Sequence, residues 1–386
     1  MGLKIGIVGL PNVGKSTLFN ALLKRQQALV ANYPFATIEP NVGIVEVPDE
    51  RLKVLAEMSQ SVKIVPATVE FVDIAGLVAG AATGAGLGNK FLTHIRDVDV
   101  ILQVLRDFKD TEIVKEGSVD PKTDYEVIET ELILKDLETI QKLKDSKTLK
   151  LKGEEKKLAV VEKLFEGLNA GRPARMVLAG EEIELARDLF LLTMKKEIRV
   201  FNVSEDDPRL KQDNITRSEI ATARSTEIRN DDAGDDSDLG QTRGSAHTEM
   251  GDGIYISAKI ESELSSLSEE DAKLFMEDLG IKESGLDKLI KKAYATLGLI
   301  SFLTTGITES RAWTIPVGTK APQAAAVIHT DFEKKFIKAK VCAYGEFVVN
   351  GGWKEAAEKG KVRFEGKDYE MRDGDVVEFM IGHSAL

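Results

Sequence analysis

The sequence predicts an α/β protein in three regions, and three patterns along its 386 residues support this. Alternating apolar residues at 3–8 are typical of a buried strand, which runs through a glycine-rich loop into a helix at 16–23. Apolar residues at helical spacing then dominate 125–194, and short strands separated by turns return in 303–386. We therefore expect an N-terminal α/β domain, a helical region and a small mixed α/β domain.

Composition describes a globular protein and excludes several classes. Hydrophobic residues make up 42% and charged residues 30%, and no apolar run approaches the about 20 residues that a membrane span requires. The N-terminus shows no cleavage-site pattern, so we expect a strand rather than a signal peptide, and a cytoplasmic protein without membrane attachment. The single cysteine, Cys342, excludes an internal disulfide framework and a cysteine-based metal site.

Acidic residues are concentrated in one segment. The net charge is −12, which argues against proteins that coat nucleic acid, and we expect a monomer without sequence-specific DNA binding. Residues 204–252 carry 13 acidic and 6 basic side chains and so contribute −7 of this charge. The stretch 206–251 has few large apolar residues, which predicts a flexible acidic loop.

The other predicted elements follow the same patterns. Strands are predicted at 42–47, 69–72 and 98–105, and apolar residues recur at helical spacing in 125–143, 158–168 and 181–194. These helices predict a hairpin that is either an ordinary surface pair or a docking arm. A strand at 197–203 resumes the first domain, so the hairpin is predicted to be an insertion. The expected domain ranges are 1–121 and 197–302 for the first domain, 122–196 for the insertion and 303–386 for the last domain.

Residues 9–16, Gly-Leu-Pro-Asn-Val-Gly-Lys-Ser, match the phosphate-loop pattern between a strand and a helix. Backbone N–H groups of such a loop wrap around phosphates, and the helix directs its positive end at them. Lys15 is the candidate partner of the β and γ phosphates, and Ser16 is the candidate hydroxyl ligand of Mg²⁺. The sequence therefore predicts a P-loop hydrolase that binds a nucleoside triphosphate with Mg²⁺.

Two further segments predict the groups around the γ phosphate. Asp73-Ile-Ala-Gly76 follows a predicted strand, where Asp73 is the candidate carboxylate on the Mg²⁺ side and Gly76 the candidate phosphate-sensing glycine. Thr37 is the candidate switch threonine that completes the Mg²⁺ shell, against the alternative of an ordinary turn threonine. We expect Lys15, Thr37 and Gly76 to carry catalysis.

Leu77 stands where many regulatory GTPases place a glutamine that orients water. An aliphatic side chain cannot do this, which predicts slow intrinsic turnover. Three alternatives remain open. Mg²⁺ and the phosphate loop act alone, a group arrives from a partner or by switch motion, or a monovalent cation such as K⁺ is held near Asn12.

The base-reading motif departs from the guanine-specific pattern Asn-Lys-x-Asp. This chain has Asn202, Val203, Ser204 and Glu205 at that place. The lysine that stacks on the base is replaced by valine, and the carboxylate is one methylene longer, so the paired polar recognition of guanine is lost. Asn202 and Val203 suit an adenine ring, and we expect a preference for ATP over GTP.

Two other residues are candidates for the walls of the base pocket. Ser257, in a Ser-Ala-Lys stretch after the strand predicted at 253–256, resembles the last loop lining such a pocket. Phe108 either lies against the nucleoside or is a core phenylalanine.

Long motifs, among them GLPNVGKSTLFNAL, NYPFATIEPN, FVDIAGLV, RAWTIPVGTKAPQAA and GKDYEMRDGDVV, resemble the Obg-like ATPase family of the YchF type over nearly the whole chain. The resemblance implies an α/β P-loop NTPase G domain with an inserted α-helical coiled-coil domain and a C-terminal β-grasp (TGS) domain. It also implies ATP hydrolysis and association with the ribosome or a ribosomal subunit.

Carried over by position, the resemblance implies phosphate contacts from Asn12, Val13, Gly14, Lys15, Ser16 and Thr17. It also implies that Ser16 and Thr37 ligate Mg²⁺ and that Val203 contacts adenine. Gln103 departs from the family, since some members have a histidine there. The acidic stretch is longer than usual, and it either alters nucleotide exchange or is a tolerated surface insertion.

Three functions fit these observations. The first is an ATPase switch that docks on ribosomes through the helical arm and the TGS domain. The second is a nucleotide-gated regulator of a protein partner in which hydrolysis is incidental. The third is a GTPase, which the altered base motif disfavours.

Overall fold

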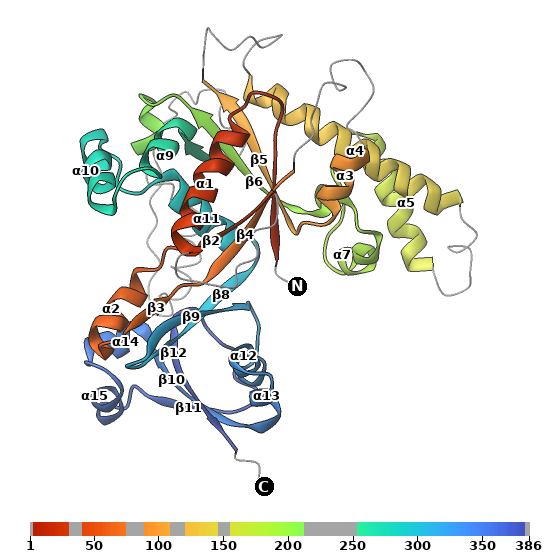
Figure 1. The fold of residues 1–386 in the computed structure, drawn as a ribbon. Helices are drawn as coiled ribbons and strands as arrows, with labels where there is room; N and C mark the ends of the chain where they lie inside the picture. The colour runs from red at the N-terminus through yellow and green to blue at the C-terminus, as the bar shows by residue number, and fades with distance from the viewer. Residues whose placement is uncertain are drawn as a thin grey trace, which may run out of the picture.

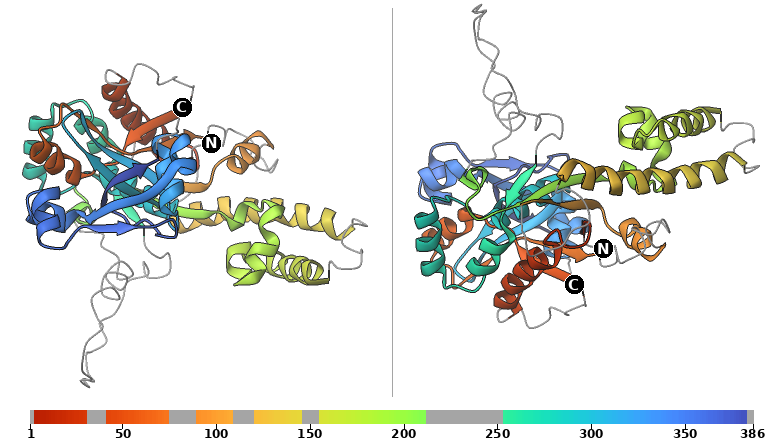
Figure 2. Two further views of the ribbon diagram at one scale, coloured as in Figure 1. Left: turned by 90° about the horizontal axis from the view of Figure 1, so that it is seen from below. Right: turned by 90° about the horizontal axis from the view of Figure 1, so that it is seen from above.

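The computed structural model describes residues 3–30, 41–74, 89–108, 120–145, 155–211 and 253–382. Figure 1 shows two sheets joined end to end, with a helical arm projecting to one side of the first sheet. The arm also stands clear of both sheets in the perpendicular views of Figure 2. Within the described residues, no helix combines the length and apolar character needed to cross a membrane.

The first sheet is a mainly parallel sheet in the strand order β2-β4-β1-β5-β6-β7. Its strands are β1 (Lys4–Val8), β2 (Val42–Glu46), β4 (Thr68–Asp73), β5 (Val100–Asp107), β6 (Lys196–Val203) and β7 (Ile254–Ile256). Only β2 runs antiparallel to its neighbour, at the edge beside β4. The central strands are buried on both faces, which explains their nearly continuous apolar sequences. Ligands of such sheets bind at the carboxyl ends of the strands.

Helices cover both faces of this sheet. They are α1 (Lys15–Val30), α3 (Asn89–Arg96), α9 (Ala258–Leu264), α10 (Glu269–Leu279) and α11 (Gly285–Thr296). On one face, Leu22 of α1 and Leu289 of α11 share a buried cluster with Ile7. On the other face, Ile95 of α3 and Ile128 of the arm pack together.

The helical arm consists of α4 (Pro121–Asp145), α5 (Glu155–Asn169), α6 (Ala174–Val177) and α7 (Glu181–Ala186). The two long helices confirm the helical spacing at 125–143 and 158–168. The helix predicted over 181–194 is wrong beyond Ala186, because two short 3-10 helices, 187–189 and 192–194, follow instead. Phe190, between these two turns, has a left-handed φ of 47°, which an α-helix cannot continue through. The carboxylate of buried Asp136 holds the second turn, since it accepts from the backbone N–H groups of Leu192 and Thr193 at 2.8 Å each.

An ionic cluster joins the arm to the first sheet. Arg175 of α6 donates to Glu129 of α4 at 2.7 Å and to Glu197 of β6 at 3.1 Å. The Tyr125 hydroxyl donates to Glu197 at 3.1 Å, and the guanidinium of Arg199 lies 4.4 Å from the Tyr125 ring centre. Because these groups are partly buried and share partners, they fix the arm more firmly than isolated surface pairs would.

The second sheet has the order β11-β10-β12-β8-β9-β3. Its strands are β3 (Lys63–Val65), β8 (Leu299–Thr305), β9 (Glu309–Pro316), β10 (Phe336–Ala343), β11 (Arg363–Glu365) and β12 (Asp375–Ile381). Four helices, α12 (Ala321–Ile328), α13 (Asp331–Lys335), α14 (Tyr344–Val349) and α15 (Trp353–Glu358), complete this region. The boundary predicted at 303 falls inside β8.

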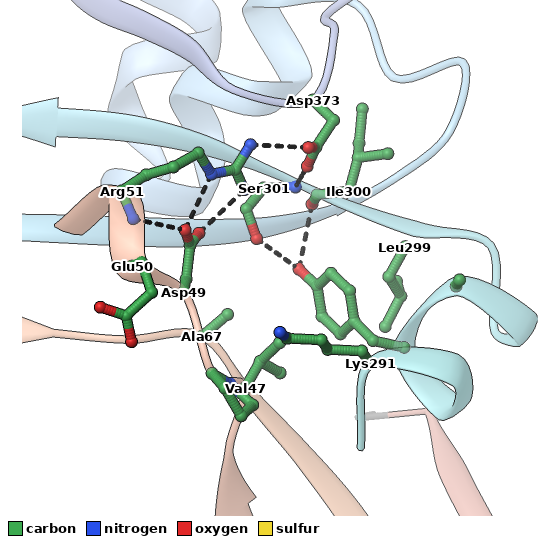
Figure 3. A pocket seen from close by; sticks show the side chains of 13 residues that line it. Val47, Asp49, Glu50, Arg51, Ala67, Lys291, Leu299, Ile300, Ser301 and Asp373 are labelled. Atoms are coloured by element: carbon green, nitrogen blue, oxygen red, sulfur yellow. Dashed lines mark hydrogen bonds and ion pairs between the residues drawn. The ribbon is translucent and has the colours of Figure 1, made fainter. Parts of the chain in front are cut away.

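A segment of the N-terminal domain takes part in the second sheet. Helix α2 (Glu50–Ser59) is followed by β3, which pairs in parallel with β9. The Ser61 hydroxyl donates to the carbonyl of Gly306 at 2.7 Å, and Arg51 donates to Asp373 at 2.7 Å. Figure 3 shows Arg51 between Asp49 and Asp373 beside a cavity of ≈ 420 Å³ at this junction. The sequence patterns predicted neither α2 nor β3.

The predicted acidic loop lies mostly outside the described residues. Its start contains a 3-10 helix at Pro208–Lys211, and the description resumes at 253.

A buried carboxylate joins α9 to α11. Glu261 is 3% exposed, and one oxygen accepts from the backbone N–H of Gly285 at 2.6 Å, while Oε2 has no hydrogen-bond partner among the described residues. Burial raises the pKa of Glu261 to about 7, and Asp287 adds to this, whereas Arg25 and the N–H groups of Gly285 and Leu286 oppose it. The folded protein therefore holds a proton that the unfolded chain releases above pH 4.5.

We expect this carboxylate to make stability fall as pH rises between 4.5 and about 7, where only the folded state keeps the proton. Glu261→Gln keeps an acceptor for Gly285 and stays neutral at every pH. Between pH 5 and pH 8, the free energy of unfolding should therefore decline by about 1–3 kcal/mol less in this variant than in the wild type. Urea unfolding of both proteins at the two pH values measures this. Exposed Glu263→Gln, on the same helix, is the matched control, and an unchanged pH slope in Glu261→Gln would refute the assignment.

Candidate nucleotide site

The phosphate loop connects β1 to α1 and requires glycine at two places. Gly14 has φ +94°, and a Cβ there would lie 2.1 Å from Nδ2 of Asn202. A Cβ at Gly9 would lie 2.8 Å from the carbonyl oxygen of Val104 in β5. Asn12 also has a positive φ, 61°. The loop therefore turns tightly against the ends of the central strands, as a phosphate-wrapping loop must.

The first turn of α1 leaves its polar side chains accessible. Ser16 and Thr17 are exposed, as is Asn12 in the loop, whereas Val13 is buried. The first helical hydrogen bond runs from the N–H of Leu18 to the carbonyl of Gly14 at 3.0 Å. The N–H groups and hydroxyls at this helix start are placed to meet an anion.

Lys15 and Asp73 form a partly buried pair of opposite charges. The Lys15 ammonium donates to the carbonyl of Gly9 at 3.4 Å. Burial lowers the pKa of Lys15, while Asp73 acts in the opposite direction. Burial likewise raises the pKa of Asp73, and Lys15 opposes it. Oδ1 of Asp73 is buried without a hydrogen-bond partner in the described part of the chain.

Asn202 joins the phosphate loop to the loop after β7. Its Nδ2 donates to the carbonyl of Val13 at 2.9 Å, and its Oδ1 accepts from the N–H of Ala258 at 2.9 Å. The side chain is 6% exposed. Ser257, next to Ala258, caps α9 by accepting from the N–H of Ile260 at 3.4 Å. One amide thus holds two loops of the site in register.

The other residues of the base motif point in different directions. The Val203 side chain is 3% exposed and packs in a cluster with Leu105 and Ile260, so it offers an adenine ring little apart from its backbone. Glu205 is half exposed and pairs with Lys259, with 2.5 Å between Oε1 and Nζ. The structure therefore brings Asn202 and the phosphate loop together, and it leaves Glu205 at the surface.

Arg106 of β5 was missed as a site candidate, whereas Gln103 of the same strand was singled out as a departure from the family. Arg106 is 1% exposed, and its guanidinium lies 4.5 Å from the centre of the Phe108 ring. Its Nε donates to the carbonyl of Phe108 at 3.3 Å, so Arg106 fixes Phe108 at the strand end. Gln103 is also buried, on the opposite face of the strand. The signal in the sequence was the polar residues Gln103 and Arg106, which together with the terminal Asp107 interrupt an otherwise apolar strand.

Thr37, Gly76 and Leu77 lie outside the described residues, so the predictions about them stay predictions. Among the residues that are described, no group of three His, Cys, Asp or Glu side chains is arranged to hold a metal ion. A metal here would rely on nucleotide phosphates, hydroxyls and one carboxylate, which is how Mg²⁺ is commonly bound.

Comparison with known proteins identifies the family. Residues 4–150 match a family model described as "50S ribosome-binding GTPase", and residues 299–382 match the model YchF-GTPase_C, described as "Protein of unknown function (DUF933)". The "Ribosome-binding ATPase YchF" of Bacillus subtilis (strain 168) is 47% identical over 386 residues, covering 98% of this chain and 99% of the relative. The chain belongs to the YchF family. The same-named proteins of Haemophilus influenzae and Escherichia coli O157:H7 are 45% and 44% identical, each with 98% of this chain and 99% of the relative covered.

A solved structure confirms the fold class of this YchF-family chain. The YchF GTPase of Schizosaccharomyces pombe matches with a TM-score of 0.81 and 38% identity, and the match covers 98% of each chain. The predicted family and the α/β P-loop fold with a C-terminal domain are both confirmed. The relatives are named as ATPases and the solved structure as a GTPase, so the names do not decide the base preference.

Asn202→Ala should destabilise the fold and weaken nucleotide binding, because it leaves the buried carbonyl of Val13 and the N–H of Ala258 unpaired. We expect a loss of about 1–3 kcal/mol in unfolding free energy and a loss of nucleotide affinity of about tenfold, or ~1.4 kcal/mol. Chemical unfolding and nucleotide titration measure the two effects. Asn350→Ala is the matched control, since Asn350 is 7% exposed and its amide donates to Glu346 of the adjacent α14, far in sequence from the phosphate loop. Equal nucleotide affinity in both variants would contradict the role of Asn202.

Proposed function

We propose that this YchF-family protein hydrolyses ATP with Mg²⁺, in preference to GTP, and acts as a conformational switch that binds ribosomes. The observation that carries the proposal is the phosphate loop, in which Lys15 faces Asp73 and Asn202 ties the loop to the base motif. The names of the bacterial relatives, ribosome-binding ATPases, support the same function.

The residues present fit Mg²⁺. Oδ1 of Asp73 is a buried oxygen without a hydrogen-bond partner among the described residues, and an oxygen left in this way suits a hard cation or its water ligand. Ser16, on the exposed first turn of α1, would supply a hydroxyl, and Thr37 would complete the shell. When bound, Mg²⁺ would neutralise charge on the β and γ phosphates.

The chain's own residues then account for charge stabilisation. The mechanism is in-line attack of water on the γ phosphate, with Lys15 and the N–H groups of residues 12–17 stabilising the developing charge. Lys15 is suited to this because Asp73 supports its charged form. Gly76 and Thr37 would sense the γ phosphate and relax after its release. K⁺ held near Asn12 is one alternative for the group that activates the attacking water. A comparison of turnover rates in K⁺ and in Na⁺ tests this alternative.

The base preference rests on the altered motif. A guanine-reading site needs a free carboxylate and a lysine stacked on the base, whereas here valine is buried and Glu205 is paired. The removal of paired polar recognition costs orders of magnitude in selectivity. The loss of these guanine-reading groups removes the discrimination against adenine.

Ribosome binding has support from the shape of the molecule. The arm of α4 and α5 projects away from both sheets (Figure 2). Some of its side chains are exposed and do not pack within the arm. We include the cytoplasm as the location and a monomer as the free state in the proposal. The alternative is a nucleotide-gated regulator of a protein partner in which hydrolysis is incidental.

Calorimetric titration with non-hydrolysable ATP and GTP analogues in Mg²⁺ tests the base preference. We expect ATP to bind more tightly, and tighter GTP would place the chain with ordinary GTPases. Lys15→Ala should lose at least about tenfold in triphosphate affinity, or ~1.4 kcal/mol, because a buried point charge is removed. Wild-type affinity in this variant would refute the site itself. Lys24→Ala, on the same helix but bonded to Ser262 and Ser266, is the control.

Turnover with and without purified ribosomes separates the two functions. A switch on the ribosome should sediment with ribosomes in a nucleotide-dependent way and hydrolyse ATP faster when bound. Unchanged turnover and no co-sedimentation in either nucleotide state would favour the regulator.

A further inference from the structure

Lys259 is the second residue of α9, which begins directly after β7, and its side chain reaches the base motif after β6. Its Nζ lies 2.5 Å from Oε1 of Glu205, and the two side chains are 69% and 47% exposed. The hydrogen bond to Glu205 raises the pKa of Lys259, and the charge of Glu263 adds to it. The ammonium therefore stays charged against the carboxylate.

The position of Lys259 is set by the backbone before it. Asn202 accepts from the N–H of Ala258 at 2.9 Å, and Ser257 caps the helix that begins there. Asn202 and Glu205 belong to the same short segment at the end of β6. The ion pair between Lys259 and Glu205 thus joins the first turn of α9 to the segment after β6, and a buried hydrogen bond already fixes the separation of these two segments.

Guanine recognition by a carboxylate requires both of its oxygens. Guanine presents two adjacent donors, N1–H and the N2 amino group, on one edge, while adenine presents only the N6 amino donor there, beside the acceptor N1. A carboxylate with one oxygen engaged by an ammonium has fewer lone-pair directions left and part of its charge neutralised, so it accepts from both guanine donors less readily than a free carboxylate.

We propose that Lys259 is a specificity-determining residue that occupies Glu205 and thereby weakens GTP binding relative to ATP. This inference rests on the proposed preference for ATP. It assigns part of that preference to an ion pair rather than to the length of Glu205 alone. Since both partners are partly exposed, the contribution is expected to be a modest one, of about three- to fivefold in relative affinity.

Lys259→Met is the variant of choice because it removes the charge and keeps the length of the apolar stem that could pack on a base. Lys259→Gln provides a second variant with a polar end. Lys273→Met in α10 is the matched control, since it removes the same charge at another exposed lysine of the same domain. In Glu205→Gln, Lys259 has no carboxylate at position 205 with which to form an ion pair, so this variant serves as the background for the double variant.

The experiment measures dissociation constants for non-hydrolysable GTP and ATP analogues, with Mg²⁺, in wild type, the three lysine variants, Glu205→Gln and the double variant Lys259→Met with Glu205→Gln. We expect Lys259→Met to raise the affinity for GTP relative to ATP by about three- to fivefold, as should Lys259→Gln. Lys273→Met should leave the ratio unchanged. In the Glu205→Gln background, Lys259→Met should also leave it unchanged.

Two outcomes overturn the inference. One is an unchanged ratio in both Lys259 variants while thermal unfolding shows them folded. The other is the same rise in the Glu205→Gln background, which would mean that Lys259 acts without Glu205. The wild-type ratio answers a separate question. If wild type prefers GTP, the proposed ATP preference fails, while the change between variants still decides whether Lys259 opposes GTP.

Discussion

The nucleotide site depends on one buried amide, that of Asn202. It donates to the phosphate loop at Val13 and accepts from Ala258, so three separated segments of the chain are held at one point. The same contact explains Gly14, because any side chain there would meet Nδ2 of Asn202. It also fixes the start of α9 and therefore the backbone position from which the Lys259 side chain extends. A single side chain therefore sets the distance between phosphate recognition and base recognition.

The segment 41–74 belongs to both sheets, which ties the nucleotide domain to the C-terminal domain. It begins at β2 and ends at Asp73, both in the first sheet, yet α2 and β3 between them pack on and extend the second. Arg51 adds an ionic contact to the turn at Asp373. Movement at either end of this segment would therefore have to be accommodated at the junction of the two sheets. Figure 3 shows where the charged side chains of the segment meet the second sheet.

Local patterns predicted the elements that local forces determine. The alternation in β1, the glycines of the phosphate loop and the periodicity of α4 each follow from a short stretch of sequence. Strand β3 could not be found in this way, since its partner β9 lies more than 240 positions later and its three residues carry no distinctive pattern. The end of the stretch expected to be helical at 181–194 is held instead by Asp136, a residue of another helix. Val203 was placed in the base pocket by its motif, but tertiary packing buries its side chain.

The distribution of unpaired polar atoms shows what the fold is arranged to receive. Within the described residues, buried atoms without hydrogen-bond partners include Oδ1 of Asp73, Nε2 of Gln103 and Nη1 of Arg106. Asp73 is the last residue of β4 and Arg106 lies near the end of β5, whereas Gln103 lies in the middle of β5. Each such atom costs about 1–3 kcal/mol, and a protein selected only for stability would pair or replace them. A cation bound with nucleotide phosphates, or its water ligand, can satisfy the Asp73 oxygen, so part of the stability given up at this residue is restored on binding, which couples nucleotide binding to folding.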